Sequence, residues 1–245
     1  SCRERAEIVE KQTQALIMQV ADLQQKVHAR PCQVFTVKVR AIMVGKDKWK
    51  SLEFPLPRKM VHQKQYCIPG GITEINATIK DLKDARMVIP NKAQLNSPIW
   101  PVQKMNASWR MTVDYCKLNQ GVTPFATAVP DVVSLLEQIN TSHGPWYAAI
   151  DLANAFFCIP VHKAYQKQFA FSLQGQQYTL TVLSRGYINS SPSCHNRVCR
   201  GLHRFSLPQG ITLVHYVDEI MLIGSSEQEV ANALDLLVRH LCARG

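Results

Sequence analysis

One stretch near the end of the chain restricts the possible folds more than any other. Residues 212–223 read TLVHYVDEIMLI, two apolar runs on either side of the adjacent carboxylates Asp218 and Glu219. Apolar runs of this length around a short polar break predict a β-hairpin with the two acids at its tip. Neither run alternates apolar with polar residues, so we expect other parts of the chain to cover both faces of the hairpin.

The paired carboxylates have two interpretations. Burying adjacent like charges is costly unless a cation compensates them, and carboxylate oxygens are suitable ligands for Mg²⁺. The alternative is an ordinary hairpin with a solvated acidic turn. A third carboxylate in a similar setting, Asp151 after the apolar segment 146–150, favours the metal-binding interpretation. Taken alone, Asp151 could equally be the N-cap of a helix.

Other segments carry clear secondary-structure signals. Helical periodicity predicts four helices, at 74–87, 130–139, 191–205 and 226–241. Asp131 is well placed to cap the second of these helices. Strand pairs are predicted at 100–104 with 109–113 and at 168–173 with 178–182.

The first 65 residues differ in character from the rest. Apolar residues at alternating spacings of three and four, from Ala6 to Val27, predict a heptad-patterned helix over residues 4–28. This helix could form a coiled-coil dimer or pack on its own chain. Residues 30–65 are expected to be a basic linker with one strand candidate at 34–44.

Bulk properties narrow the class of protein. The net charge of +10 favours a polyanionic partner, although ribosomal, chromatin and membrane-surface proteins share this bias. The eight cysteines lack zinc-site spacing, and Cys194, His195 and Cys199 come nearest to a ligand cluster. We therefore expect free thiols and an intracellular chain, cytoplasmic or nuclear and not secreted. The charged N-terminus is unlike a signal peptide, and no apolar run approaches membrane-spanning length, so no membrane partner is expected.

Several motifs, in order, resemble those of retroviral reverse transcriptases. The segment YVDE at 216–219 is similar to the Tyr-x-Asp-Asp box of these enzymes, with Glu in the last place. The similarity continues upstream through SPIWPV at 97–102, WRMTVDYCKLN at 109–119 and DLANAFF at 151–157. It covers roughly residues 66–245. It is greatest to the gammaretrovirus-like elements found as endogenous copies in vertebrate genomes.

The resemblance implies an α+β fold. We expect the fingers and palm of a right-hand polymerase, with an antiparallel palm sheet backed by helices, plus an N-terminal helix. The expected segments are a helix at 1–29, a linker at 30–65, fingers at 66–126 and 159–189, and palm at 127–158 and 190–245. The chain lacks an initiator Met and ends before the thumb of the family, so we expect a fragment that holds its primer–template poorly.

The resemblance also implies a site for primer-directed DNA synthesis. Asp151, Asp218 and Glu219 would be the catalytic residues and would bind two Mg²⁺ ions, with Mn²⁺ as a substitute. The residues implied to contact the incoming deoxynucleoside triphosphate are Lys104, Arg110, Phe156, Arg185 and Tyr216. The two basic hairpin residues would hold its phosphates, and Phe156 would exclude a 2′-hydroxyl. The expected partners are a primer on an RNA or DNA template and deoxynucleoside triphosphates.

Several positions depart from the family pattern. Glu219 is one methylene longer than the expected Asp, which should disturb metal geometry. Arg185 replaces a Gln that packs near the incoming base, and it adds bulk and charge there. Further exchanges relative to the family are Cys116, Ser184 and Cys199. These departures support a second hypothesis, a catalytically inactive endogenous-retroviral relic that binds nucleic acid or self-associates through residues 4–28.

Overall fold

A computed structural model describes residues 33–40, 51–68, 70–103, 108–126, 129–142 and 144–243 of the chain, with the backbone alone described at 33–40 and at Ala153. Three sequence predictions fall outside these ranges. They concern the helix at 4–28, the linker residues 41–50 and the triphosphate contact Lys104.

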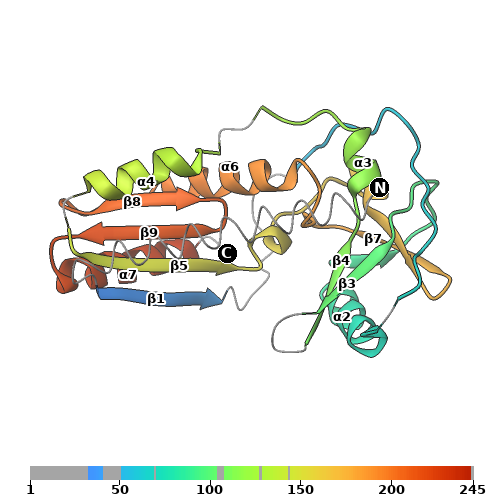
Figure 1. Cartoon of the computed structure of the whole chain (residues 1–245), viewed down its shortest axis with the longest axis horizontal. Coiled ribbons are helices and arrows are strands. Elements are labelled where there is room, and N and C mark those ends of the chain that lie inside the picture. Colours follow the sequence, from blue (N-terminus) through green and yellow to red (C-terminus); the bar gives the residue numbers. More distant parts are fainter. Residues whose placement is uncertain are drawn as a thin grey trace.

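The predicted hairpin forms half of a four-stranded sheet (Figure 1). Its strands, β8 (Thr212–Tyr216) and β9 (Glu219–Gly224), are joined by a two-residue turn. β5 (Trp146–Ala153) pairs antiparallel with β9, and β1 (Gln33–Arg40) forms the edge beyond β5. The antiparallel palm sheet is therefore confirmed for three strands. β1 arises from the strand candidate at 34–44, and its parallel pairing with β5 was not predicted.

Helices cover both faces of this sheet, as the apolar strands predicted. α6 (Ser190–Leu202) and α7 (Glu227–Cys242) lie against one face. The core on that side contains Ile150, Ile220, Leu222, Val230 and Leu237. α4 (Val132–Thr141) packs against the other face, where Leu135 meets Val214 and Ile223. The two faces separate because successive side chains of a strand point in opposite directions.

The start of α4 follows the predicted capping chemistry. The Asp131 Oδ1 atom accepts a hydrogen bond from the Val133 N–H at 2.7 Å. This bond satisfies a backbone donor that the first helical turn leaves without a partner, and it lowers the pKa of the Asp131 carboxyl. The predicted cap is confirmed.

The remaining elements form smaller sheets beside the four-stranded one (Figure 1). The predicted strand pairs are present as β3 (Ile99–Gln103) with β4 (Trp109–Val113), and as β6 (Ala170–Leu173) with β7 (Gln176–Leu180). β2 (Val88–Pro90) pairs with β7 and completes a three-stranded sheet. The helical elements of this part are α2 (Ile72–Asp84), α3 (Cys116–Gln120), η1 (Ala155–Cys158), α5 (Lys163–Gln166) and η2 (Lys167–Phe169).

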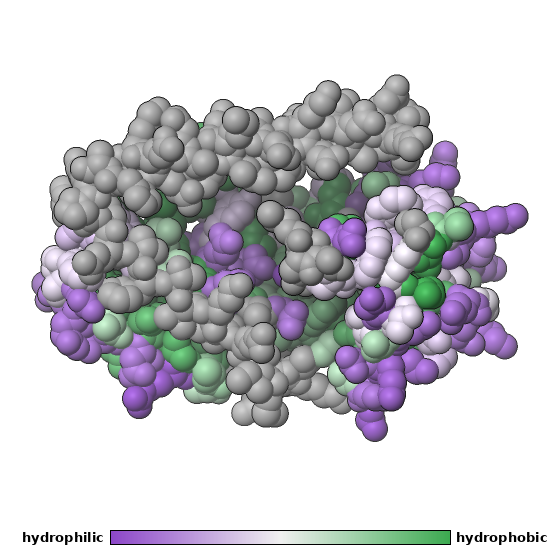
Figure 2. Space-filling view, turned by 60° about the horizontal axis from the view of Figure 1, so that its bottom comes forward, coloured by the Kyte–Doolittle hydropathy of each residue, from purple (hydrophilic) through white to green (hydrophobic). Residues whose placement is uncertain are grey.

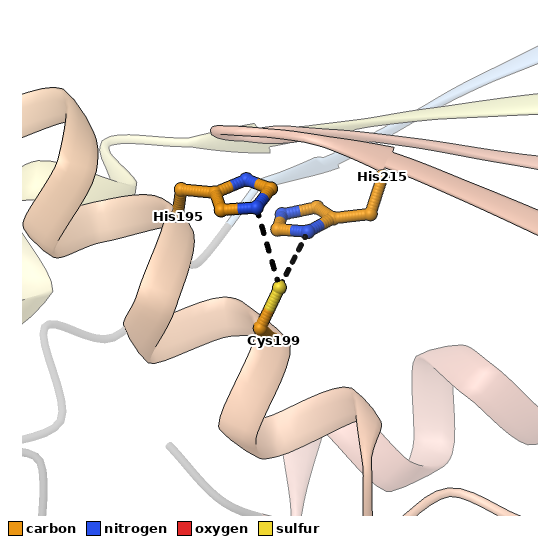
Figure 3. Close-up of side chains that lie close together, drawn as sticks. All are labelled: His195, Cys199 and His215. Atoms are coloured by element: carbon orange, nitrogen blue, oxygen red, sulfur yellow. Dashed lines mark hydrogen bonds between the residues drawn. The ribbon is translucent and has the colours of Figure 1, made fainter. Parts of the chain in front are cut away.

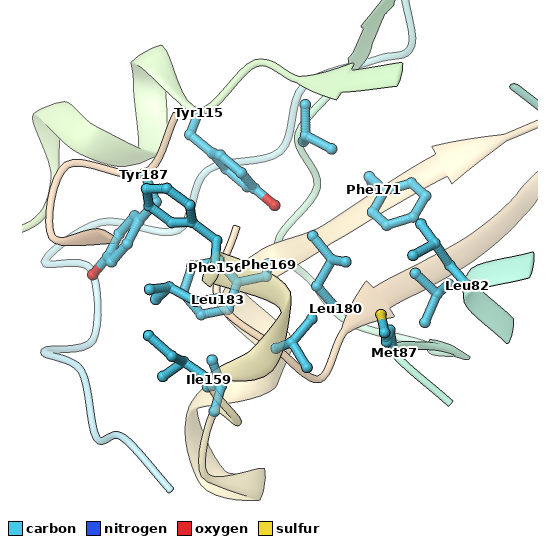
Figure 4. Close-up of a cluster of buried hydrophobic side chains, with 14 of the residues drawn as sticks. Leu82, Met87, Tyr115, Phe156, Ile159, Phe169, Phe171, Leu180, Leu183 and Tyr187 are labelled. Carbon is cyan, nitrogen blue, oxygen red and sulfur yellow. The ribbon is translucent and has the colours of Figure 1, made fainter. Parts of the chain in front are cut away.

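An aromatic core lies among the smaller sheets (Figure 4), and it extends to the β8–β9 turn of the four-stranded sheet. Tyr115, Phe169 and Tyr187 meet edge to face, with ring centroids 4.9 to 6.4 Å apart. Phe156 and Val217, which lies in the β8–β9 turn, belong to the same buried cluster. The turn that carries Asp218 is therefore anchored in a rigid interior.

The surface around α2 is polar. Hydrophilic side chains dominate this end of the molecule, at the right of Figure 2. Each helix within the described ranges is too short or too polar to cross a bilayer.

Candidate active site

The fold brings three carboxylates to one end of the palm sheet. Asp151 in β5 is the direct strand partner of Glu219 in β9, and Asp218 precedes Glu219 in the turn. The Leu152 N–H donates to the Asp218 carbonyl oxygen at 2.9 Å, which fastens the turn to β5. Asp151 and Asp218 are 67 positions apart in the sequence, and the expected meeting of the two is observed. The alternative role of Asp151 as a helix cap is excluded, because it lies inside β5.

The local electrostatics reflect this gathering of negative charge. The pKa of Glu219 is raised, first by burial and then by the charges of Asp218 and Asp151. A neighbouring negative charge disfavours ionisation of a carboxyl group, so the three side chains repel one another when all are charged.

Arg185 supplies a positive charge at this point. Its Nη2 atom lies 3.6 Å from Oδ2 of Asp218, and its guanidinium carbon lies 5.4 Å from the centroid of the Phe156 ring. The sequence predicted Arg185 near the incoming base. In the structure Arg185 contacts both Asp218, a candidate metal ligand, and Phe156, the residue expected to exclude a 2′-hydroxyl.

The carboxylate oxygens are not yet gathered as they would be around an ion. Among the described residues, three potential ligand atoms from His, Cys, Asp or Glu come within 4.8 Å of one another at one place, and that place is elsewhere. The Asp218 carboxylate points to Arg185 instead. A shared ion would therefore require Asp218 to exchange its guanidinium partner for a metal.

The predicted nucleotide contacts lie on different elements of the fold. Phe156, in η1, is 7% exposed and packs mainly into the core. Tyr216, at the end of β8, is 38% exposed and pairs with Glu219. Arg110 is exposed on β4, opposite Val102 of β3.

A cavity of about 430 Å³ lies between α4 and the sheet, beside the acids. Its lining includes Leu135 and Ile139 of α4 and Met221 of β9. Asp151 and Glu219 also line it, so the carboxylates border an apolar space as well as the charged side occupied by Arg185.

A second polar cluster lies on the other side of the sheet, and the sequence revealed only part of it. His195 and Cys199 of α6 meet His215 of β8 (Figure 3). The Cys199 sulfur lies 3.4 Å from His195 Nε2 and 3.4 Å from His215 Nδ1. The spacing of His195 and Cys199, four residues apart on a helix, was a readable signal. His215 was hidden because its place depends on how α6 packs against the sheet.

Comparison with known proteins identifies the family. Residues 102–245 match the model of the family described as reverse transcriptase (RNA-dependent DNA polymerase). The Pro-Pol polyprotein of feline foamy virus is 35% identical over 189 residues, which is 76% of this chain and 16% of that protein. The Gag-Pol polyprotein of walleye dermal sarcoma virus is 29% identical over 184 residues, which is 74% of this chain and 10% of that protein. The chain thus spans a small part of these relatives.

Solved structures agree with this result. A foamy viral protease-reverse transcriptase in complex with double-stranded DNA has a TM-score of 0.72 and 27% identity, over 93% of this chain and 46% of that chain. A foamy viral protease-reverse transcriptase in complex with an RNA/DNA hybrid gives a TM-score of 0.71 and 27% identity, over 93% of this chain and 29% of that chain. The expected fingers-and-palm fold is therefore confirmed, and the chain belongs to the retroviral reverse transcriptases.

Proposed function

We propose that this chain is the catalytic core of an RNA-directed DNA polymerase that adds deoxynucleotides to a primer 3′-hydroxyl. The observation that carries the proposal is the meeting of Asp151 with Asp218 and Glu219 at one end of the sheet. The net charge of +10 suits a nucleic-acid substrate. The foamy viral neighbours bind double-stranded DNA and an RNA/DNA hybrid, and we propose a primer on an RNA or DNA template as the partner here.

The cofactor in this proposal is Mg²⁺, with Mn²⁺ as a substitute. Reverse transcriptases use divalent metal ions, and three carboxylates form an oxygen donor set that suits these cations. The pKa of Glu219 is raised first by burial and then by the charges of Asp218 and Asp151, and a bound cation would favour the ionised form again. When bound, two ions would activate the primer 3′-hydroxyl and neutralise the departing pyrophosphate.

Each candidate site residue has its own role in this proposal. Asp151 and Asp218 hold the ions, and Glu219 is a third ligand whose extra methylene displaces its carboxylate. Arg110, together with Lys104, holds the triphosphate by charge-assisted hydrogen bonds. Phe156 forms the floor of the sugar pocket. Its burial supports this role, because a ring fixed by packing cannot move aside for a 2′-hydroxyl.

Tyr216 and Arg185 complete the proposed nucleotide site. Tyr216 is partly exposed beside Glu219, where it can support the incoming nucleotide. Arg185 competes with the metal for Asp218, since the guanidinium and a cation seek the same carboxylate.

A second candidate function is supported by this same contact. If Arg185 permanently neutralised Asp218, the chain would bind nucleic acid through its positive charge and would not polymerise. Such binding would weaken with salt and would be indifferent to Mg²⁺. Self-association through residues 4–28 belongs to this alternative.

Primer extension on a homopolymeric RNA template with Mg²⁺ separates the two candidates. The Asp151→Asn variant keeps the shape of the side chain and removes its charge, so we expect incorporation to fall by at least about 100-fold. Asp235→Asn, an exposed carboxylate on α7 paired with Arg239, is the matched control and should retain full activity. Equal incorporation by the wild type and Asp151→Asn would contradict the polymerase proposal. No incorporation by either protein would favour the second candidate.

A further inference from the structure

The buried histidines His195 and His215 and the half-buried Cys199 form a closed circuit of hydrogen bonds. The Val217 N–H donates to His195 Nδ1 at 3.2 Å, and His215 Nε2 lies 2.9 Å from the Val217 carbonyl oxygen. The Cys199 sulfur stands between the two remaining ring nitrogens at 3.4 Å from each. The path therefore begins and ends on the backbone of a single residue.

The protons of this circuit can be assigned from its fixed ends. A backbone N–H always donates, so His195 Nδ1 is an acceptor and the neutral ring carries its proton on Nε2. A carbonyl oxygen always accepts, so His215 Nε2 carries the proton and Nδ1 is free. Cys199 then accepts from His195 Nε2–H and donates its S–H to His215 Nδ1. All four contacts are satisfied by one arrangement of neutral groups.

Burial keeps these groups neutral. The side chains of His195 and His215 are 3% and 8% exposed, and their rings stack with centroids 4.5 Å apart and planes 7° from parallel. Burial lowers the pKa of both imidazoles, that of His215 to about 4, and raises the pKa of the Cys199 thiol. At neutral pH the cluster therefore holds no charge that would compete with its hydrogen bonds.

A metal ion suits this cluster less well, although its three ligand atoms lie within 4.8 Å of one another. An ion on His195 Nε2 would require a proton on Nδ1, which would face the Val217 N–H donor. An ion at a bonding distance of about 2 Å from both ring nitrogens would also lie out of the plane of at least one of the two nearly parallel rings. Zinc binding would have to break the circuit and turn a ring.

The circuit holds Val217, whose backbone conformation is strained. Val217 has a φ of +54°, in the left-handed region that β-branched residues rarely adopt. It is the first of two turn residues between β8 and β9, and the second is Asp218. A change of φ at Val217 would swing the Asp218 carboxylate away from Asp151 and Glu219.

We propose that His195, Cys199 and His215 are positioning residues, whose closed hydrogen-bond circuit holds Val217 in its left-handed conformation and thereby aims Asp218 into the active site. The circuit binds the backbone of the turn on the α6 side of the sheet. On the β5 side, the Leu152 N–H donates a hydrogen bond to the Asp218 carbonyl oxygen. The effect of the circuit on metal binding rests on the function proposed above. The existence of the circuit does not depend on that function.

Hydrogen exchange of the Val217 amide tests the circuit directly, on the 245-residue chain and without any need for activity. In Cys199→Ala the chain of hydrogen bonds is cut, and we expect the Val217 amide to exchange about five to ten times faster than in the wild type. Cys199→Ser can both donate and accept, and should stay within about threefold of the wild type. Cys242→Ala removes an exposed thiol of α7 that lies outside the circuit, and should leave this exchange rate unchanged.

Manganese binding, followed by electron paramagnetic resonance, tests the consequence for Asp218. We expect Cys199→Ala to weaken binding about fivefold, with Cys199→Ser restoring it and Cys242→Ala leaving it unchanged. Unchanged Val217 exchange in Cys199→Ala would overturn the circuit. One equivalent of zinc retained by the wild type and lost in Cys199→Ala would also overturn it, in favour of a metal site. If the wild type bound no Mn²⁺, the proposed function would fail, while faster Val217 exchange in Cys199→Ala would still support the circuit.

Discussion

The two sides of the β8–β9 turn differ in the charge of the side chains that surround them. On the active-site side, Asp151, Asp218 and Glu219 bring negative charges together, and Arg185 offers a positive charge to them. On the helix side, His195 and His215 could be charged but are kept neutral by burial. The same two-residue turn thus separates a charged, accessible surface from a neutral, enclosed one.

This difference indicates how the turn can bind a cation and remain fixed. In the proposed function Asp218 must exchange Arg185 for a metal ion. This exchange requires that solvent reach the carboxylate and that the ion pair with Arg185 be weak. The Asp218 side chain is 24% exposed and that of Arg185 is 50% exposed, so their attraction is screened. The two histidines that fix the turn are buried, where hydrogen bonds are stronger, and Cys199 between them is half-buried.

The largest expected effect concerns the neutral side. Burial lowers the pKa of His215 to about 4, while an unfolded chain takes up this proton near its ordinary value of about 6.5. The stabilising effect of the neutral form is therefore complete above about pH 6.5 and is lost as the pH falls toward 4, by about 2–3 kcal/mol at pH 4.5. Urea unfolding at pH 7 and pH 4.5 measures this loss.

Two variants show whether His215 is responsible for the loss. His215→Gln should be less stable at pH 7 but should lose less stability on acidification than the wild type. His203→Gln, at an exposed position, should retain the wild-type difference between the two pH values. An identical loss in His215→Gln and the wild type would mean that the buried side does not depend on neutrality at this position.

A smaller effect is expected on the charged side. Arg185→Gln removes the cation that faces Asp218, so Mg²⁺ should bind more tightly. Exposed ion pairs contribute up to about 1 kcal/mol, which corresponds to an increase in affinity of at most about fivefold. Competition between Mg²⁺ and Mn²⁺ in the wild type and the variant measures the change. Weaker Mg²⁺ binding in Arg185→Gln would show that the guanidinium assists the site instead of competing with the metal.

The smallest effect concerns Glu219. Burial and the neighbouring charges raise its pKa, so its protonated form stabilises the fold at low pH, and this contribution is lost as the pH rises through the raised pKa. At pH 7 without metal, Glu219→Gln should therefore be more stable than the wild type. The gain should be less than about 1 kcal/mol, because burial of Glu219 is only partial and solvent still reaches the residue and screens its charge. Thermal unfolding at pH 7 and pH 4 tests both the sign and the loss of the gain in acid. A less stable variant at pH 7 would contradict the repulsion described for the three acids.

The local elements were largely predictable from the sequence. The hairpin at 212–223 follows from two apolar runs around a polar break, and α4 follows from its apolar spacing and the Asp131 cap. The approach of Asp151 to Asp218 was expected from the family motifs and the apolar segment before Asp151. Such signals can be read from the sequence because they depend on residues that are neighbours in the chain.

The features missed by the sequence depend on contacts between distant segments. The ion pair of Arg185 with Asp218 joins positions 33 residues apart, and His215 meets Cys199 across a helix–sheet interface. The left-handed Val217 opposes the local preference of a β-branched residue, so no local rule could predict it. The parallel pairing of β1 with β5 spans more than 100 residues and left no local signal.

Binding of Mn²⁺ to the wild type and to Asp151→Asn, followed by electron paramagnetic resonance, tests the central claim most directly. Three carboxylates that share ions predict saturable binding by the wild type and at least about a tenfold loss of affinity in Asp151→Asn, with no loss of folding stability. The same affinity in both proteins, or no saturable binding in either, would contradict the claim that this end of the sheet is a divalent-metal site.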